Sequence, residues 1–286
     1  MIRHVSGVIA AIAFVILCTV LPFLPGGYDS LAVPLSAMAQ IVGTLGLVVV
    51  PFGLLWVAAD RWQRLAQSRF VFVSLSLIAS TLVSAGLSLG AILHSGFALG
   101  ALVVVLSVYA VSKAWLKFKQ ARGTTPLTST STWSSAVPFY LITVPVAVAL
   151  FQFAFVDRAI EFSRNRAILN SSPLIATLEQ HRATNGRYPT SLQSVWPDYQ
   201  PNIIGIREYS YAPHGDSYNL FFFEQFTYRF GTREFVMYNP RDEHVMTAHA
   251  TDILELTPQQ LALERTRGHY ARHDLPQPHW KLFWFD

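Results

Sequence analysis

The fold of this chain turns on one stretch near its middle, residues 136–170, which read AVPFYLITVPVAVALFQFAFV and then DRAIEFSRNRAILN. The first part, 136–156, carries no charged residue and matches the roughly 20 helical residues that cross a ~30 Å hydrocarbon core. The second part, 157–170, is amphipathic. The stretch therefore predicts a membrane span that continues as a helix out of the bilayer and into a water-soluble domain.

Four further apolar runs precede this span. They cover residues 5–24, 31–59, 70–93 and 96–115, and the only charge in any of them is Lys113 at one end. A charge at the centre of a span costs about 2.5–3.5 kcal/mol, so uncharged runs are what lipid selects. The predicted fold is an α-helical bundle of about five membrane spans in 1–156, followed by a soluble α+β domain with an antiparallel sheet in 157–286.

The charges divide at the same boundary. Of 21 Lys and Arg residues, eight lie before Asp157 and 13 after it, whereas two of the 17 Asp and Glu residues lie before it and 15 after it. The eight early basic residues flank alternate apolar runs, so the positive-inside rule puts the N-terminus in the cytoplasm and the C-terminal domain on the far side. The pI of 9.3 is thus a topology signal and predicts no nucleic-acid partner.

Two features of the spans have alternative interpretations. The first run follows Arg3 and could be a cleaved signal peptide, although no small-x-small cleavage site follows it. Small residues at four-residue spacing predict close helix packing, the alternative being a polar lane for a substrate; they are Ser76, Ser80, Ser84, Ser88, Gly96 and Gly100.

The soluble domain shows its own start and stop signals. Ser171 and Pro173 predict a helix start, and Asn185-Gly186 with Pro189 predicts its end. Hairpins are expected from 209–211 with 218–223 and from 234–238 with 244–248, then a helix over 257–269 and an aromatic tail. Alternation in the tail favours a strand over a membrane anchor, with Trp280, Leu282 and Trp284 on one face. We expect residues 171–286 to fold as a unit.

The region from 173 to 197 resembles the helix-to-loop segment of type II secretion pseudopilins and related pilin-like proteins. The matching positions are Leu178, Gly186, Tyr188, Pro189, Leu192 and Pro197. The resemblance implies a pilin-like α+β fold in a bacterial inner-membrane protein. It does not imply filament assembly, because the leader, the intramembrane Glu and the acidic calcium loop of that family have no counterpart near residues 136–156 or beyond.

Motifs that could carry chemistry are weak. Gly86-Leu-Ser88-Leu-Gly90 matches the nucleophile-elbow pattern but lies in an apolar helix. Metal binding has three candidate ligands, His269, His273 and His279, of which the first two would share one side of a helix end. No Glu stands between them, so no metal, cofactor or catalytic residue is predicted.

These observations favour a bacterial envelope interaction or assembly protein that presents its soluble domain to an unidentified envelope protein, with the lipid bilayer as its second partner. A small-molecule transporter or channel is the first alternative, although the deepest polar side chains are only Gln40, Gln152 and the serines. A membrane-bound enzyme is the second.

Overall fold

The computed structural model describes residues 2–61, 137–195, 199–223, 233–244 and 270–285, together with residues 71, 74–83 and 85 and scattered positions between 101 and 116. The chain divides into two compact units. The helical unit comprises Met1–Val20 and Pro34–Asp157, and the sheet unit comprises Leu21–Val33 and Arg158–Asp286. A short segment near the N-terminus therefore belongs with the C-terminal part of the chain.

In the described part of the chain, three helices are long and apolar enough to cross a membrane, namely His4–Phe23, Ala32–Ala58 and Val137–Asn185. They confirm three of the predicted apolar runs as helices. The runs at 70–93 and 96–115 lie largely outside the described residues, where Ser74–Val83 is a shorter apolar helix.

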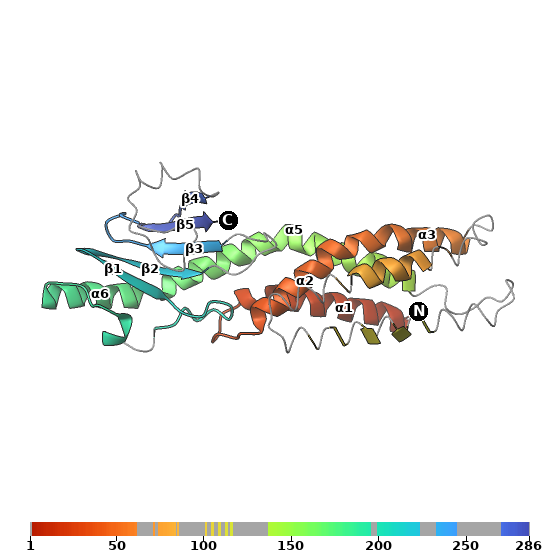
Figure 1. Cartoon of the computed structure of the whole chain (residues 1–286), viewed down its shortest axis with the longest axis horizontal. Coiled ribbons are helices and arrows are strands. Elements are labelled where there is room, and N and C mark those ends of the chain that lie inside the picture. The colour runs from red at the N-terminus through yellow and green to blue at the C-terminus, as the bar shows by residue number, and fades with distance from the viewer. Residues whose placement is uncertain are drawn as a thin grey trace. The chain divides into compact units, whose positions relative to one another are not determined.

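The helices of the helical unit are α1 (Ile2–Val20), α2 (Ala32–Gly46), α3 (Val50–Arg61) and the first part of α5 (Val137–Asn170), with the 3-10 turn η2 (Leu47–Val49) joining α2 to α3 (Figure 1). Glycines let α2 and α3 approach α5 closely. A Cβ on Gly46 would lie 3.0 Å from Pro145, and one on Gly53 would lie 2.8 Å from Ile142. From Gly46 to Gly53 the residue numbers rise along α2 and α3, whereas their partners in α5 fall from Pro145 to Ile142. The helices α2 and α3 therefore run antiparallel to α5.

The helix α5 is one element of 34 residues, as the sequence predicts. At 1.5 Å per residue it is about 51 Å long, which exceeds the hydrocarbon core by about 20 Å. A one-residue break at Ser171 separates it from α6 (Ser172–Asn185). The Ser171 hydroxyl donates to the carbonyl of Ile168 at 2.6 Å, so it does not cap α6 as predicted.

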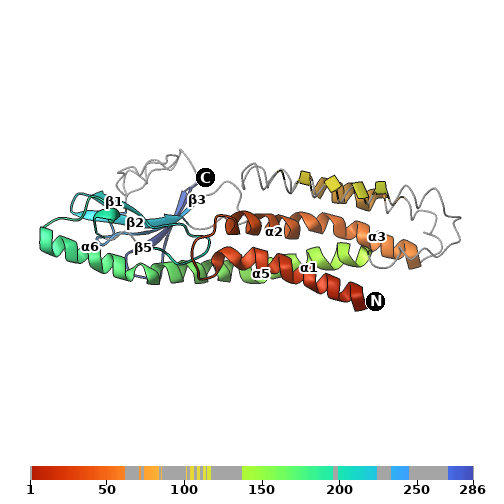
Figure 2. The same ribbon diagram turned by 90° about the horizontal axis from the view of Figure 1, so that it is seen from below.

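The sheet unit contains a five-stranded antiparallel sheet of order β1-β2-β3-β5-β4. The strands are β1 (Ser210–His214), β2 (Ser217–Phe223), β3 (Arg233–Tyr238), β4 (Tyr270–Asp274) and β5 (Trp280–Phe285). Both views show α6 and the end of α5 along one face of the sheet (Figure 2). The predicted β1–β2 hairpin and the strand at the C-terminal tail are confirmed.

The predicted second hairpin is wrong. Both edges of β3 are occupied, one by β2 and the other by β5, which the hairpin prediction did not expect. The expected partner strand, residues 244–248, lies outside the described residues except for His244. The aromatic tail, as β5, pairs with β3 along its whole length, from Arg233 opposite Phe285 to Tyr238 opposite Trp280. The predicted helix over 257–269 lies outside the described residues.

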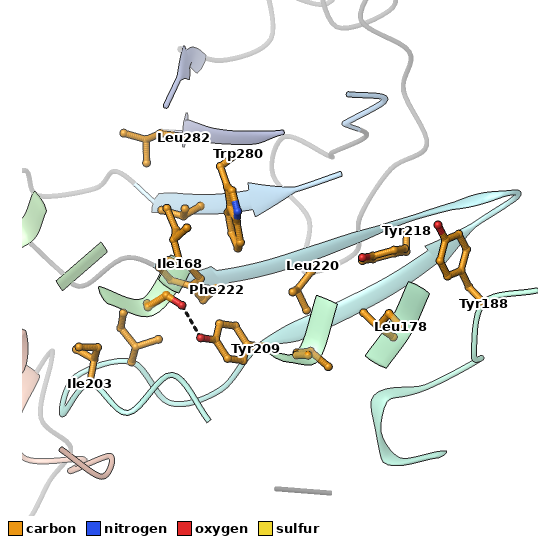
Figure 3. Close-up of a cluster of buried hydrophobic side chains, with 14 residues drawn as sticks. Ile168, Leu178, Tyr188, Ile203, Tyr209, Tyr218, Leu220, Phe222, Trp280 and Leu282 are labelled. Carbon is orange, nitrogen blue, oxygen red and sulfur yellow. Dashed lines mark hydrogen bonds between the residues drawn. The ribbon is translucent and has the colours of Figure 1, made fainter. Parts of the chain in front are cut away.

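The core of the sheet unit lies between the helices and the sheet (Figure 3). It includes Leu174 and Leu178 of α6, Tyr218, Leu220 and Phe222 of β2, and Trp280 and Leu282 of β5. Two core residues, Ala167 and Ile168, come from α5, and the buried Tyr209 hydroxyl donates to the Ala167 carbonyl at 2.6 Å. The core therefore begins before Ser171, the expected start of an independently folding unit.

The segment Leu21–Val33, here called the strap, also pairs with the sheet unit. The Gly26 and Asp29 amides donate to the carbonyls of Asn202 and Ile204 at 3.0 and 2.9 Å. In return, the Ile204 and Gly205 amides donate to Leu24 and Pro22 at 3.0 and 2.9 Å. Four long-range backbone hydrogen bonds thus fix the loop between α1 and α2 to a loop of the C-terminal part.

A glycine pair tests this pairing. Gly26 has φ +155°, and a Cβ there would lie 2.9 Å from Ile204, whereas nothing lies within 4 Å of a Cβ on Gly27. We expect Gly26→Ala to destabilise the sheet unit by about 1–3 kcal/mol, because alanine rarely adopts that backbone conformation. Gly27→Ala should change the free energy of unfolding by less than about 0.5 kcal/mol. Equal unfolding midpoints for the two variants in detergent would contradict the pairing.

Candidate functional site

The residues predicted to pack the helices are described only in part. Ser76 is buried, and the Ser80 hydroxyl donates to the Ser76 carbonyl at 2.7 Å. This hydrogen bond satisfies the Ser80 donor within its own helix. The rest of the set, Ser84, Ser88, Gly96 and Gly100, lies outside the described residues.

The Gly-x-Tyr-Pro motif closes α6. Gly186 adopts the left-handed conformation at φ +73°, and its amide donates to the Arg182 carbonyl at 2.8 Å. Tyr188 then folds back, donating to the Glu179 carboxylate at 3.0 Å and packing edge-on against Tyr218 with ring centroids 4.7 Å apart. The Pro189 carbonyl accepts a hydrogen bond from Tyr211 at 2.8 Å. These contacts give the motif a structural role.

The tyrosines beside this motif are held in the neutral form. Burial raises the pKa of Tyr218 and of Tyr209 well above the usual range of a phenol. The pKa of Tyr188 is also raised, chiefly by burial. The cluster therefore joins α6 to the sheet through ring contacts and through hydrogen bonds from the neutral Tyr188 and Tyr218 hydroxyls to the Glu179 carboxylate.

Of the three candidate metal ligands, the two that the structure describes, His273 and His279, do not lie in a helix. His273 lies in strand β4, opposite Leu282 of β5, so the prediction that it ends a helix is wrong. His279 lies in the turn before β5, and His269 lies outside the described residues. Among the described residues, no group of three or more His, Cys, Asp or Glu side chains could hold a metal ion.

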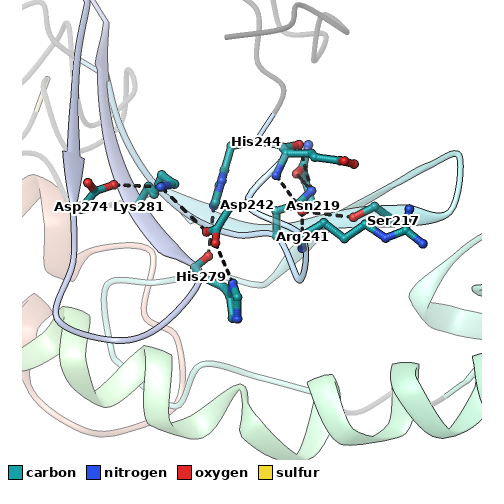
Figure 4. A network of polar contacts seen from close by, with 10 residues as sticks. Ser217, Asn219, Arg241, Asp242, His244, Asp274, His279 and Lys281 are labelled. Atoms are coloured by element: carbon teal, nitrogen blue, oxygen red, sulfur yellow. Dashed lines mark hydrogen bonds and ion pairs between the residues drawn. The ribbon is translucent and has the colours of Figure 1, made fainter.

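His279 instead belongs to a polar cluster that joins two loops, residues 239–244 after β3 and residues 275–279 before β5 (Figure 4). We call this cluster the clasp. At its centre the buried Asn239 side chain accepts from Ser217 at 3.1 Å and from the Arg241 amide at 2.9 Å. It also donates to Asn219 at 2.9 Å and to the Glu243 carbonyl at 3.0 Å. Every polar atom of this amide is therefore satisfied.

The second part of the clasp is a pair of histidines. Buried His244 donates through Nε2 to the His279 carbonyl at 3.0 Å. The backbone amide of Asn239 donates to the same carbonyl at 3.1 Å. The His279 ring contacts Asp242 with Nδ1 and Oδ2 3.0 Å apart. His279 and Asp242 have φ of +65° and +58°, a conformation that non-glycine residues adopt at a cost.

Both positive and negative side chains lie near His244 and His279. Lys281 lies 2.9 Å from Asp274 and 3.8 Å from Asp242, and Arg241 lies 3.8 Å from Asp216. The balanced charges do not favour either an anion or a cation as a ligand. The Asp242 carboxylate orients the His279 ring, and the clasp is otherwise a set of contacts that joins two loops.

The clasp was not recognised from the sequence as a site. Asn239 to Asp242 were predicted only as a turn, and His244 was placed in a strand. Asn-Pro at 239–240 is a signal for turn initiation. No local pattern indicates that this turn meets the turn before β5.

The helical unit has a smaller polar cluster. The Ser36 hydroxyl donates to the Thr19 carbonyl at 2.6 Å, and the Gln40 amide nitrogen donates to Ser36 at 3.1 Å. Gln152 of α5 donates weakly to the Ala39 carbonyl at 3.4 Å. The Gln40 side-chain oxygen is buried without a hydrogen-bond partner. This cluster links α1, α2 and α5 through side chains that the sequence marks as the deepest polar ones.

Comparison with known proteins finds no matching family model, curated protein or solved structure.

The clasp predicts a loss of stability in acid. Burial is the main cause that lowers the pKa of His244 from 6.5 to about 4, so the folded state binds this proton less well than the unfolded state. The contribution of neutral His244 is complete above about pH 6.5 and is lost as the pH falls through about 4. A shift of this size corresponds to about 3 kcal/mol.

We expect His244→Gln to reduce the difference in unfolding midpoint between pH 7 and pH 5, since Gln retains an N–H donor and does not titrate. The control is His181→Gln, which removes a histidine outside the clasp whose ring contacts the Arg187 carbonyl at 3.1 Å. This variant leaves His244 and its surroundings intact, so we expect the wild-type pH dependence. The same pH dependence in wild type and His244→Gln would refute the assignment.

Proposed function

We propose that this chain is a multi-pass bacterial inner-membrane protein that presents a pilin-like domain on the extracytoplasmic side for interaction with, or assembly of, other envelope proteins. The observation that carries the proposal is the way the sheet unit is attached. The helix α5 continues from an apolar segment into the core of that unit, and the strap adds a second attachment between α1 and α2.

The attachment supports the proposal that the sheet unit and the early basic residues lie on opposite sides of the membrane. The end of α1, the start of α2 and the outer part of α5 all lead into the sheet unit. Because α3 runs antiparallel to α5, Arg61 at the end of α3 and Val137 at the start of α5 lie at the other end of these helices. Arg3 lies in the first turn of α1 at that end as well, next to His4, whose carbonyl accepts from Tyr140 near the start of α5. The positive-inside rule therefore favours a cytoplasmic location for this end of the helices.

The proposal keeps the full set of five spans. The predicted runs 70–93 and 96–115 stand between α3 and α5, and two crossings return the chain to the end from which it started. The pilin-like character is supported by a long apolar helix that enters a soluble core, by the Gly186-x-Tyr188-Pro189 closure, and by the antiparallel sheet that follows.

A topology test uses the single Cys18, which is replaced by alanine before one new cysteine is introduced at a time. Ser191→Cys and Gln180→Cys, at exposed positions of the sheet unit, should react with a membrane-impermeant maleimide in intact spheroplasts. Gln63→Cys should react only after permeabilisation. The opposite pattern would refute the orientation, and labelling of all three sites in intact cells would refute the membrane topology.

The interaction itself is tested with a photo-crosslinking amino acid in the full-length protein. Gln180 and Ser191 are exposed in the sheet unit, and Leu150 is an exposed apolar residue of the helical unit. We expect discrete protein adducts from positions 180 and 191 and none of the same mass from position 150. Adducts at none of the three positions would count against an interaction role.

Transport is the second candidate function, and the observation that favours it is the unpartnered oxygen of Gln40 inside the bundle. A transport role requires that Gln40→Leu alter solute movement and that positions 180 and 191 give no crosslinked protein adducts. An interaction role requires the reverse, because Gln40 lies outside the sheet unit.

A further inference from the structure

Several exposed apolar side chains of the sheet unit lie close in sequence to the points where the chain passes between this unit and the helical unit. Six large hydrophobic residues of this unit are exposed among those the structure describes: Leu24, Tyr28, Leu31, Phe162, Leu169 and Phe223. The first three belong to the strap, and Phe162 follows the predicted end of the α5 span by six residues. The exposed fractions of Tyr28, Leu31 and Phe162 are 45%, 50% and 52%.

Chain connectivity limits how far these residues can lie from the bilayer. Leu31 directly precedes α2, and Tyr28 precedes the first residue of α2 by four positions. Even a fully extended chain spans at most about 3.6 Å per residue, so Tyr28 lies within about 14 Å of the start of that helix. Phe162 lies about 9 Å along α5 beyond Val156, at 1.5 Å per residue.

The strap is also a fixed surface. Its backbone is paired with residues 202–205, and Asp29 accepts a further hydrogen bond from the Leu31 amide at 2.8 Å. Phe23 and Ala32 are buried at its two ends, so the strap is held by packing as well. The outward direction of Leu24, Tyr28 and Leu31 is therefore set by the fold of the sheet unit.

We propose that Leu24, Tyr28, Leu31 and Phe162 form a bilayer-contacting base, which inserts into the boundary between headgroups and acyl chains around the protein's own spans. Aromatic and aliphatic side chains favour this zone, and a tyrosine places its ring in the apolar part and its hydroxyl in the headgroups. The proposal goes beyond the proposed function, since it holds whichever side of the membrane the sheet unit occupies.

The charges near the base indicate the kind of lipid contact. Asp29 and Asp157 carry negative charge, Arg158 carries positive charge, and Arg207 lies 3.9 Å from Glu208. With both signs present, apolar insertion rather than attraction to anionic headgroups holds the base on the membrane. Contact should therefore be as strong in zwitterionic lipid as in a mixture with anionic lipid, and it should resist salt.

The test places an environment-sensitive NBD fluorophore on the full chain in phosphatidylcholine nanodiscs, with Cys18→Ala as the background. The labelled positions are Tyr28→Cys, Leu31→Cys and Phe162→Cys, and the controls are Gln180→Cys and Ser191→Cys. We expect nitroxide-labelled lipid to quench the three base positions at least twofold more than the controls. Raising the salt to 0.5 M should leave that ratio unchanged.

Equal quenching at base and control positions would overturn the proposal. Each labelled variant is first compared with the unlabelled chain by thermal unfolding, and Leu24→Cys replaces any position that lowers the midpoint. A wrong orientation of the whole protein would reverse the maleimide pattern and leave the quenching ratio high, so failure of the base and failure of the proposed function are distinguishable.

Discussion

The continuity of α5 is the constraint on which the rest of the structure depends. Inside hydrocarbon every backbone amide and carbonyl must be satisfied within the segment, so an apolar run that crosses the bilayer must be helical. The helix does not stop where its side chains become polar, and Ala167 and Ile168 near its end are part of the core of the sheet unit. One helix thus has a segment that is apolar enough to cross a membrane and a segment that packs in the core of the sheet unit.

The strap follows from the same constraint. Because α1 and α2 deliver the chain to the end at which α5 enters the sheet unit, the short loop between them lies within reach of residues 202–205. Its amides and carbonyls need partners, and the loop from 202 to 205 supplies them. The sheet unit is therefore continuous with the helical unit through α5 and also through the strap, which continues from α1 and into α2.

The clasp lies where the sheet takes in β5, the last strand of the sheet in the chain. Strand β5 enters between β3 and β4, so the loops after β3 and before β5 meet. Asn239 and His244 join them by hydrogen bonds to the His279 carbonyl, and they hold His279 and Asp242 in costly backbone conformations. The hydrogen bonds of the Asn239 side-chain amide, all of whose polar atoms have partners, offset the cost of these backbone conformations. Buried His244 makes the arrangement sensitive to acid.

The sequence by itself determined the features that rest on local physics. Apolar runs of span length predicted the helices α1, α2 with α3, and α5; Gly186 predicted the end of α6; and the runs 209–211 and 218–223 predicted the first hairpin. Tertiary structure alone decided that the distant strand β5 pairs with β3, that the strap joins the sheet unit, and that His279 meets Asp242 and His244. Helix formation and tight turns depend on neighbours within a few positions, which a sequence displays directly. The pairing of distant strands and loops depends on which of several competing contacts buries the most apolar surface and satisfies the most backbone groups, and that comparison exists only in the folded chain.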